Sequence, residues 1–563
     1  MKVIIVGGVA GGATAAARIR RLDEQAEIVV FERSGFISYA NCGLPYYIGS
    51  TIEDEKELTL QTPQSFQDRF NIDVHVHHEV TAIHPETKTV AVKNVETGQF
   101  FKESYDKLLL SPGARPITPP FEGMDSGKVF TIRTVEDTLK IKNYIDSRRP
   151  ASAVIVGGGF IGIEMAENLR DLGLDVTLVE ASDQLMAPFD KDMASLIHAQ
   201  VRRNSIHLML DTMVQGFADH EDHMEVKLKN TPALHTDMVI MAIGVAPETT
   251  LAKEAGLELG IKDAIVVNDQ METSVPDIYA VGDAVQIRNF VTGQDTLISL
   301  AGPANKQGRI AADTICGLDS HYKGGQGSSV IKLFDMTAAA TGINEKTANA
   351  LGIEYGKVIL SPMNHAGYYP GGELMTLKVL FEKDTYHLLG AQIAGYSGVD
   401  KRIDVLAAAI RAGMKAYDLS ELDLAYAPPY SSAKDPVNMA GFMIENIKNG
   451  LVKQWYYEDL GPLLKSGKVT LLDTRTPAEF NAGHINGFIH IQVDELRGRL
   501  DELDTDKPVY VMCQSGLRSY IACRILSGHG LDAYNFAGGY RFYEAVRSEK
   551  ELSKRSSPCG MDQ

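Results

Sequence analysis

Two segments about 150 residues apart show the same order of features, and this repeat limits the possible folds more than any other property of the chain. Each has a short β-branched run, a glycine-rich turn, an alanine-rich helix, a second strand and a terminal glutamate, over residues 2–32 and 153–180. Such β-α-β units are typical of a doubly wound α/β fold. The sequence therefore predicts two domains that bind nucleotides.

The second unit contains a complete G-x-G-x-x-G pattern between a predicted strand and a predicted helix. Its glycines, Gly157, Gly159 and Gly162, allow a tight turn, close approach to a pyrophosphate and close packing of the helix on the strand. Glu180 follows 18 residues after Gly162 and is expected to bind the adenosine ribose. A 2′-phosphate would be repelled there, and residues 180–186 contain no Arg or Lys to receive it. The pattern favours NADH over NADPH.

The first unit departs from this pattern, because Val9 stands where the middle glycine belongs. Glu32 again ends the second strand, and Asp283, in the segment YAVGDAV, could meet a polyol chain. Two unlike dinucleotide sites in one chain suggest a flavin and a nicotinamide that exchange a hydride. We therefore predict FAD at the first site.

Length and composition exclude several classes of protein. At about 150 residues per domain, 563 residues indicate three to four domains. The charge of 55 − 73 = −18 argues against a nucleic-acid partner, and no run of 18 apolar residues predicts a membrane span. The N-terminus superficially resembles a secretory signal, but its regularly spaced glycines indicate a nucleotide-binding turn instead. Five cysteines without a C-x-x-C pair predict no structural metal, and we expect a cytoplasmic protein.

Cys42, in FISYANCGLPYYIG, follows the first unit, so it is expected near the reactive end of the bound flavin. Its polar neighbours suggest a helix start, which would lower the thiol pKa. No second cysteine lies within thirty residues, so its oxidised partner must be a substrate thiol, a persulfide or an oxygen species. The alternative is a buried, inert cysteine.

Cys513 opens a second candidate site in the segment VYVMCQSGLRSYIACRIL. A strand, a short loop and a helix would let the loop amides converge on the sulfur, and Arg518 would add positive charge. Farther back, Thr14, Arg18 and Arg21 share one face of the first predicted helix and could hold phosphates. The alternative for that face is a solvated basic surface.

The motif S-Y-A-N-C-G-L-P-Y, with the two glycine patterns and AVGDA, resembles the single-cysteine flavoprotein disulfide reductases, most of all coenzyme A disulfide reductase. The resemblance covers Met1 to about Gly450. It implies two interleaved Rossmann-like dinucleotide-binding domains, an α+β dimerisation domain, an obligate homodimer, and a mixed disulfide between Cys42 and coenzyme A. The last hundred residues, with LLDTRTPAEFNAGHINGFIHI and a six-residue Cys-to-Arg loop, resemble an α/β rhodanese domain, which implies sulfane sulfur as the cargo of Cys513.

The resemblance also implies roles for individual residues. The FAD contacts would be Gly7, Gly11, Gly12, Glu32, Val80, Ser111, Arg133, Asp283 and Ala301. The NAD contacts would be Gly157, Gly159, Phe160, Ile161, Gly162, Glu164, Glu180 and Gly244. The coenzyme A contacts would be Thr14, Arg18, Arg21, Ser38, Asn41 and Lys434. The catalytic groups would be Cys42, Cys513, Arg518 and two tyrosines that reach the partner subunit's active site, Tyr368 and Tyr426.

These assignments predict a chain of four domains with a polar tail. The predicted limits are 1–112 and 245–322 for FAD binding, 113–244 for NAD binding, 323–450 for dimerisation, 451–553 for the rhodanese domain and 554–563 for the tail.

The expected activity is NADH-dependent reduction of coenzyme A persulfide, polysulfide or coenzyme A disulfide through Cys42, with sulfane sulfur handled by Cys513. One alternative is an NADH oxidase or peroxidase that cycles through a Cys42 sulfenic acid. Related peroxidases and oxidases have a catalytic His in the first glycine loop, where this chain has Ala10, and this difference counts against peroxide or oxygen. Another alternative is a non-catalytic sulfide or redox sensor.

Overall fold

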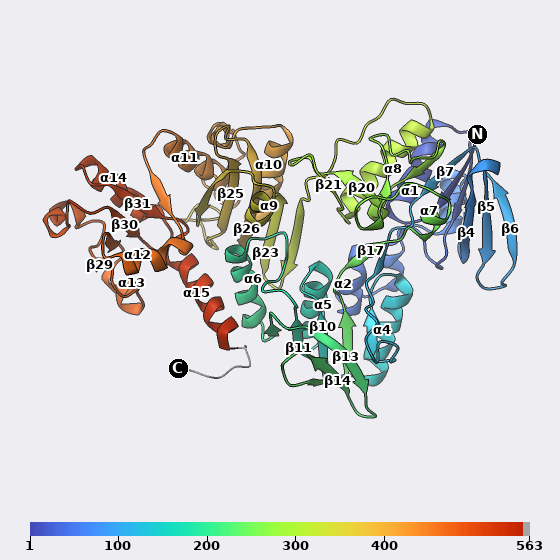
Figure 1. Ribbon diagram of the computed structural model, residues 1–563, viewed down its shortest axis with the longest axis horizontal. Coiled ribbons are helices and arrows are strands. Elements are labelled where there is room, and N and C mark those ends of the chain that lie inside the picture. Colours follow the sequence, from blue (N-terminus) through green and yellow to red (C-terminus); the bar gives the residue numbers. More distant parts are fainter. Residues whose placement is uncertain (556–563) are drawn as a thin grey trace. The chain divides into compact units, whose positions relative to one another are not determined.

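The computed structural model describes residues 1–555 and divides into two compact units (Figure 1). The first unit comprises Met1–Asp183 and Ser205–Gly327. The second comprises Gln184–Asn204 and the chain from Ser328 onward. None of the helices in the described part of the chain is long and apolar enough to span a membrane. The predicted tail lies mostly outside the described residues, and so does Cys559.

The first repeat forms a parallel sheet in the first unit. Its strand order is β19 (Ile278–Ala280), β7 (Lys107–Leu110), β1 (Lys2–Val6), β2 (Glu27–Phe31) and β3 (Asp73–His75). Helix α1 (Ala10–Leu22) connects β1 to β2 and packs against α8 (Ala301–Ile315). Strand β1 is almost wholly buried, as expected for a central parallel strand covered on both faces.

The second repeat forms another five-stranded parallel sheet. Its order is β12 (His207–Met209), β11 (Asp175–Val179), β10 (Ser152–Val156), β16 (Met238–Met241) and β9 (Val129–Thr131). Helix α5 (Phe160–Asp171) connects β10 to β11. Because β19 returns to the first sheet after the second is complete, the two sheets are interleaved along the chain. This confirms the predicted pair of interleaved dinucleotide-binding folds.

Smaller elements complete the first unit. Three short sheets are formed by β4 (His78–His84), β5 (Thr89–Asn94) and β6 (Phe100–Ser104), by β13 (Val214–Asp219), β14 (Met224–Leu228) and β15 (Leu234–Thr236), and by β18 (Ile265–Val266), β20 (Val285–Arg288) and β21 (Asp295–Thr296). Strands β8 (Ala114–Pro116) and β17 (Val245–Pro247) pair where the chain passes between the two large sheets. The remaining helices are α2 (Leu44–Ile48), α3 (Pro63–Phe70), α4 (Val135–Arg148) and α7 (Thr250–Glu254).

The second unit begins with an antiparallel sheet, which confirms the predicted α+β domain. Its order is β22 (Ser329–Leu333), β23 (Met336–Gly342), β26 (Leu388–Gly395), β25 (Thr376–Glu382) and β24 (Tyr355–Leu360). The associated helices are α6 (Lys191–Arg203), α9 (Glu345–Ala350), α10 (Val399–Arg411) and α11 (Pro436–Lys448). Helix α10 packs on β23 and β26 through its apolar face.

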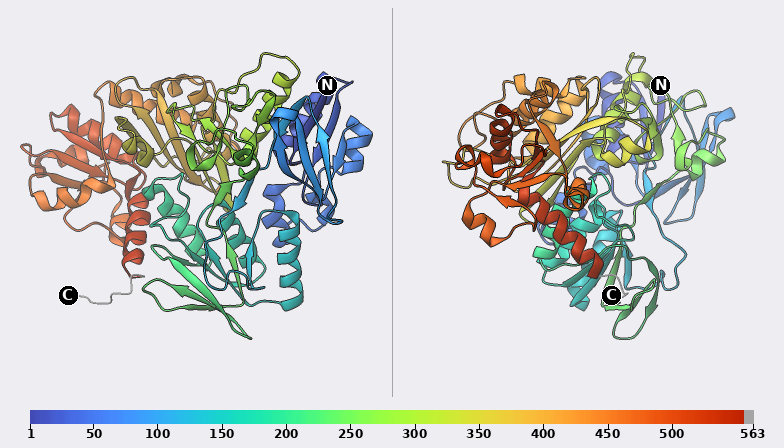
Figure 2. Two further views of the ribbon diagram at one scale, coloured as in Figure 1. Left: turned by 45° about the vertical axis from the view of Figure 1, so that its right-hand side comes forward. Right: turned by 60° about the vertical axis from the view of Figure 1, so that its left-hand side comes forward.

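The C-terminal part of this unit is a third parallel sheet. Its order is β27 (Lys453–Trp455), β31 (Ala533–Phe536), β30 (Val509–Met512), β28 (Thr470–Asp473) and β29 (Ile489–His490). Its helices are α12 (Leu460–Ser466), α13 (Pro477–Ala482), α14 (Leu517–Gly528) and α15 (Gly539–Arg555). Helix α15 packs along α6 (Figure 1, Figure 2). This confirms the predicted α/β domain at the C-terminus.

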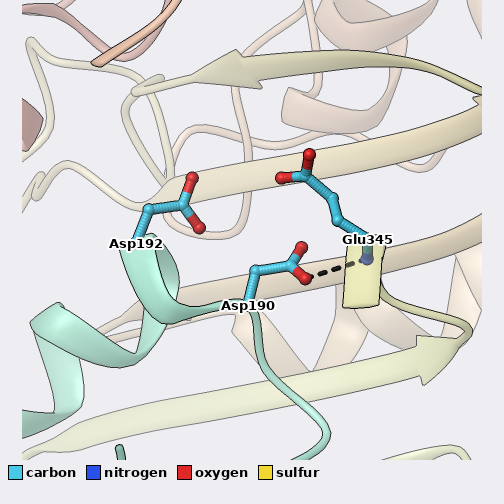
Figure 3. Close-up of side chains that lie close together, drawn as sticks. All are labelled: Asp190, Asp192 and Glu345. Atoms are coloured by element: carbon cyan, nitrogen blue, oxygen red, sulfur yellow. Dashed lines mark hydrogen bonds between the residues drawn. The ribbon is translucent and has the colours of Figure 1, made fainter. Parts of the chain in front are cut away.

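A buried lysine attaches α6 to the antiparallel sheet. Lys378, on β25, is completely buried, and its Nζ lies 2.9 Å from an oxygen of Asp190 and 2.9 Å from one of Asp192. It also contacts Glu345, whose backbone N–H donates to Asp190 over 2.8 Å (Figure 3). Burial opposes the charged form of Lys378, but the three carboxylates outweigh burial and raise its pKa. Three carboxylates could also hold a metal ion, yet here the ammonium group already contacts all of them.

Replacing Lys378 with Met should destabilise the second unit by about 3–5 kcal/mol, because Asp190 and Asp192 would then lie in the protein interior without their cation, whereas Glu345 would keep its ion pair with Lys357. The midpoint of denaturant unfolding, followed by Trp455 fluorescence, measures this effect. Lys383→Met is the matched control, because Lys383 pairs with Glu354 at the surface. Equal midpoints for the two variants would contradict the prediction.

Candidate functional site

A cavity of about 860 Å³ in the first unit contains most of the residues predicted to bind FAD. Its wall includes Gly7, Gly11, Glu32, Val80, Ser111, Arg133, Asp283 and Ala301. Gly12 is not part of the wall: a Cβ there would lie 1.9 Å from the carbonyl oxygen of Gly7, so this glycine serves the packing of α1 on β1. The volume is within the range of cofactor pockets.

Glu32 is held at the end of β2 by backbone amides. It is buried, and its two carboxylate oxygens accept hydrogen bonds from the N–H groups of Gly8 and Ser34, each over 2.9 Å. A carboxylate fixed at this point of a β-α-β unit suits the ribose hydroxyls of a dinucleotide. The residues present therefore fit FAD, and Glu32 would hold its adenosine half.

Arg133 lies between the predicted flavin and coenzyme A residues. Its guanidinium donates to the Asn41 side-chain oxygen over 2.6 Å, and the Asn41 amide donates to the Arg133 carbonyl over 3.1 Å. A nitrogen of the same guanidinium lies 3.7 Å from a carboxylate oxygen of Asp283. Burial raises the pKa of Asp283, and Arg133 opposes that shift.

Cys42 opens into the same cavity from a single 3-10 turn, Asn41–Gly43, immediately before α2. The helix start was predicted, but the lowered thiol pKa was wrong. Partial burial in the cavity wall raises the pKa of Cys42, the negative charges of Glu164 and Asp283 raise it further, and Arg133 opposes them. A five-residue helix offers too small a dipole to offset these effects.

Glu164, on α5, is the charged group that raises the pKa of Cys42 most. Burial raises its pKa to about 7, although the hydroxyl of Tyr46 donates a long hydrogen bond of 3.5 Å to its carboxylate. Tyr46 comes from α2, four residues after Cys42. The packing of α2 on α5 thus places a carboxyl group that titrates near neutrality beside the thiol.

The predicted NAD residues meet at the start of α5. Glu180, just beyond β11, accepts hydrogen bonds from the Gly158 N–H over 2.6 Å and from the Ser182 N–H over 2.8 Å. A Cβ at Gly162 would lie 1.9 Å from the Gly157 carbonyl oxygen, whereas a Cβ at Gly159 would meet no atom within 4 Å. Gly159 therefore leaves room for a pyrophosphate, and the turn before α5 is suited to a dinucleotide.

The residues predicted to bind coenzyme A do not all lie together. Thr14, Ser38 and Asn41 line the cavity. Arg18 does not line it, since its Nε donates to Asp313 over 2.7 Å, and Arg21 is exposed on α1. Lys434 is exposed in the second unit.

Tyr368 and Tyr426 lie together in the second unit, although 58 residues separate them. Their hydroxyl oxygens are 2.9 Å apart, and the hydrogen bond with Tyr368 raises the pKa of Tyr426. Both side chains are exposed, Tyr368 by 76% and Tyr426 by 47%. The pair is therefore available to a ligand or to a second protein chain.

Cys513 lies at the carboxyl end of β30, where the loop before α14 folds over its sulfur. The Gly516 N–H donates to Sγ over 3.1 Å, and the Ser519 hydroxyl donates over 3.2 Å. Gly516 has φ +101°, a conformation that brings its amide toward the sulfur at no steric cost. Two hydrogen-bond donors thus converge on one buried sulfur, an arrangement suited to holding a persulfide.

Two ion pairs flank this loop. Arg518 donates to both oxygens of Glu479, each over 2.7 Å. Arg475 and Asp473 form a buried pair with an N–O distance of 2.8 Å. Arg518 thus stands beside Cys513, but its charge is already paired.

The sequence analysis missed Tyr46, Ser519 and Glu479. Only Glu479 had a usable signal, because T-P-A-E at residues 476–479 is a capping-box pattern, and both of its hydrogen bonds form at the start of α13. The position of Tyr46 beside Glu164 depends on how α2 packs on α5, which short motifs do not report. Ser519 lies only six residues after Cys513, in the first turn of α14, but a lone serine there is no recognisable signal.

Comparison with known proteins assigns the chain's parts to three families. Residues 1–308 match the model for pyridine nucleotide-disulphide oxidoreductases, 328–436 the dimerisation domain of the same enzymes, and 457–545 the rhodanese-like domain.

Relatives with similar sequence or structure include three informative cases. Coenzyme A disulfide reductase of Staphylococcus haemolyticus is 38% identical over 79% of this chain and 100% of its own. Reduced CoADR-RHD of Bacillus anthracis is 47% identical with a TM-score of 0.95, covering 97% of this chain and 98% of that one. The NAD-dependent persulfide reductase of A. fulgidus is 36% identical with a TM-score of 0.91, covering 96% and 100%.

Replacing Glu164 with Gln should increase the reactivity of Cys42 in the holoenzyme above pH 7. The carboxyl loses its proton near that pH and then opposes formation of the thiolate, so its removal should lower the Cys42 pKa. An interaction of about 1 kcal/mol corresponds to a roughly fivefold faster alkylation of Cys42 by iodoacetamide at pH 8.

Alkylation rates measured from pH 5 to 9 test this expectation. The wild-type profile should contain an inflection near pH 7 that Glu164→Gln removes. Glu53→Gln, an exposed change in the same unit, serves as the control for net charge. Superimposable profiles for wild type and Glu164→Gln would contradict the prediction.

Proposed function

The chain belongs to the pyridine nucleotide-disulphide oxidoreductase family, and from this we propose that it uses NADH to reduce coenzyme A disulfide or coenzyme A persulfide at Cys42. One observation carries the proposal: a cysteine with no neighbouring cysteine opens into a cavity built for a dinucleotide. Such a thiol must form its disulfide with a substrate. The three relatives support coenzyme A or a persulfide as that substrate.

The cofactors we propose are FAD in the large cavity and NADH at the turn before α5. Bound FAD would supply the two electrons that NADH delivers as a hydride. Glu32 would hold the adenosine half of FAD, and Asp283 and Arg133 would lie toward the flavin. Glu180 would bind the adenosine ribose of NADH, with Gly159 against the pyrophosphate and Glu164 toward the nicotinamide.

The reaction at Cys42 needs one thiolate and one proton. The Cys42 thiolate attacks a sulfur of coenzyme A disulfide, its S–S bond breaks, and a coenzyme A thiolate leaves as the mixed disulfide forms. With coenzyme A persulfide the leaving group is hydrosulfide. Two electrons and one proton then return the mixed disulfide to the Cys42 thiolate and a coenzyme A thiol.

The hydroxyl pair of Tyr368 and Tyr426 is the proposed donor of a proton or hydrogen bond to the leaving sulfur. The exposure of both side chains and the dimerisation domain support a homodimer in which the pair serves the active site of the second copy. Thr14, Ser38 and Asn41 would bind coenzyme A, and Arg21, which is exposed on α1, would meet its phosphates. Because the described cysteines are free, a reducing compartment such as the cytoplasm suits the enzyme.

Cys513 would carry sulfane sulfur, including sulfur that originates in polysulfide, and transfer it to coenzyme A. The two hydrogen bonds to its sulfur and the match to rhodanese-like domains support this role. The product, coenzyme A persulfide, is then a substrate for Cys42. Arg518 would stabilise the loop through its pair with Glu479.

An NADH oxidase or peroxidase is the second candidate, with Cys42 cycling through a sulfenic acid. The carboxyl of Glu164 near the thiol does not distinguish the two activities, but Ala10 in the first glycine loop offers no acid–base group for peroxide. Steady-state rates with oxygen, peroxide, coenzyme A disulfide and coenzyme A persulfide would separate them. Fastest turnover of oxygen would overturn the favoured function, and no NADH oxidation with any acceptor would favour a sensor.

Cys42→Ser should abolish NADH oxidation by coenzyme A disulfide, with at least a 10³-fold loss of kcat, because no thiolate remains to form the mixed disulfide. The FAD spectrum and its reduction by NADH should persist, which shows that both nucleotides still bind. Cys316→Ser is the control, since Cys316 is half-buried beside Asp313 and away from the cavity wall. Turnover by Cys42→Ser at the wild-type rate would overturn the proposal.

Tyr426→Phe should lower kcat roughly tenfold, and the Tyr368→Phe/Tyr426→Phe double variant roughly 100-fold, because the leaving thiolate loses its proton donor. The loss should grow as pH rises, when the bulk solution supplies fewer protons. Tyr430→Phe, at another highly exposed tyrosine, is the matched control. An unchanged kcat in the double variant would exclude the pair from catalysis.

A further inference from the structure

The loop between Cys513 and Arg518 has no cationic side chain of its own that could bind a sulfur donor. Between Cys513 and Arg518 its residues are Gln514, Ser515, Gly516 and Leu517, none of which is charged. The electrostatic stabilisation at the sulfur comes from neutral donors, the Gly516 N–H and the Ser519 hydroxyl.

The guanidinium of Arg518 is already neutralised. Both of its terminal nitrogens donate to Glu479 over 2.7 Å, a bidentate geometry that fixes the fork as well as its charge. Glu479 is itself held by the backbone N–H of Thr476 over 2.8 Å and by its hydroxyl over 2.9 Å, as part of the capping box of α13. The carboxylate is thus fixed from two sides and remains beside Arg518.

A second guanidinium near the loop is paired as well. Arg475 donates to both carboxylate oxygens of Asp473 and reaches the Gln514 side-chain oxygen over 3.4 Å. Its guanidinium also lies 3.8 Å from the centre of the Tyr540 ring. Arg475 therefore supports the loop through Gln514, and its ion pair with Asp473 has no net charge.

Apolar side chains are exposed where α14 begins. Leu517, the first residue of α14, is 56% exposed, and Ile521, four residues later on the same face of the helix, is 41% exposed. Exposed aliphatic side chains at the start of α14 suit the carbon chain of an organic thiol better than the charged oxygens of an inorganic anion.

We propose that Cys513 accepts its sulfur from the persulfide of an organic thiol and discriminates against thiosulfate, and that Glu479 sets this preference by neutralising Arg518. This rests on the proposed function, in which Cys513 carries sulfane sulfur. The Cys513 thiolate attacks the outer sulfur of R–S–SH, the S–S bond breaks, and R–S⁻ leaves while Cys513 becomes a persulfide. Atoms and charge balance without any further reactant.

Thiosulfate meets a different electrostatic situation at the same sulfur. It is a dianion, so its approach brings two negative charges to a thiolate, and its leaving group, sulfite, is a dianion as well. A free cation at Arg518 would stabilise both, whereas the Glu479–Arg518 pair has no net charge to offer. An organic persulfide brings at most one negative charge on its reacting sulfur group, and the sulfur of its leaving thiolate carries a single charge.

Glu479→Gln in the full-length holoenzyme tests the proposal. Gln keeps the capping box but releases the charge of Arg518. The sulfur donors are thiosulfate and glutathione persulfide, cyanide is the common acceptor, and thiocyanate is the readout, with Cys513→Ser as the blank. We expect glutathione persulfide to be the better wild-type donor by at least tenfold in kcat/KM. Glu479→Gln should raise kcat/KM for thiosulfate about tenfold, an effect that salt weakens, and change the persulfide value less than twofold.

Two control variants separate this effect from general changes in charge. Glu495→Gln removes a carboxylate elsewhere in the same domain, where it pairs with Arg499. Arg541→Gln removes a cation whose backbone N–H contacts the Gln514 carbonyl. Both should leave the donor preference unchanged, and a tenfold shift with Arg541→Gln would assign the preference to Arg541 and overturn the role of Glu479.

Other outcomes distinguish this inference from the proposed function. A wild-type enzyme that prefers thiosulfate, or a Glu479→Gln variant with no gain on thiosulfate, overturns the inference and leaves reduction at Cys42 intact. Failure of both donors to load Cys513 overturns the inference and the carrier role together. NADH oxidation by coenzyme A disulfide, measured on the same preparations, reports the proposed function independently, because Glu479 lies outside the cavity that contains Cys42.

Discussion

A close contact between two glycines in each β-α-β repeat determines where the other elements of the nucleotide-binding part of the chain can lie. In both units the second glycine of the pair approaches the carbonyl of the first so closely that a Cβ would lie 1.9 Å from its oxygen, at Gly12 over Gly7 and at Gly162 over Gly157. This close approach seats each helix on its strand and aims its N-terminus at the place for a pyrophosphate. Cys42 and Glu164 take their positions from elements attached to these two helices and strands.

Local patterns predicted those units well, because strand, turn, helix and acidic residue all lie within about thirty residues. The same holds for the Cys513 loop, where the predicted amide donor is the N–H of Gly516, although the Ser519 hydroxyl was not predicted. The pairing of Tyr368 with Tyr426 was expected only through resemblance, since nothing local brings them together. The raised pKa of Cys42 escaped prediction because it arises from burial and from Glu164, 122 residues away in sequence. Arg18 was predicted to meet phosphates, but the distant Asp313 holds its guanidinium.

The sulfur atoms of Cys42 and Cys513 have different electrostatic surroundings. Cys42 lies near the carboxylates of Glu164 and Asp283 in a cavity wall. Burial and these negative charges oppose formation of its thiolate until a substrate and cofactors alter its surroundings. The sulfur of Cys513 is buried and accepts hydrogen bonds from two neutral donors, the Gly516 N–H and the Ser519 hydroxyl. The raised pKa of Cys42 suits a thiol that reacts only when substrate and cofactors are bound, whereas hydrogen-bond donors around a buried sulfur suit a site that carries a reactive sulfur atom.

The segment Gln184–Asn204 also affects how such chains can be recombined. It leaves the nucleotide-binding part of the chain, supplies Asp190 and Asp192 to Lys378, and returns, so the polypeptide crosses between the two units three times. A chimera joined at residue 327 would take α6 from one parent and β25 from the other. Its carboxylates and its lysine would then come from different lineages, and only parents that match at this buried contact would yield a stable hybrid.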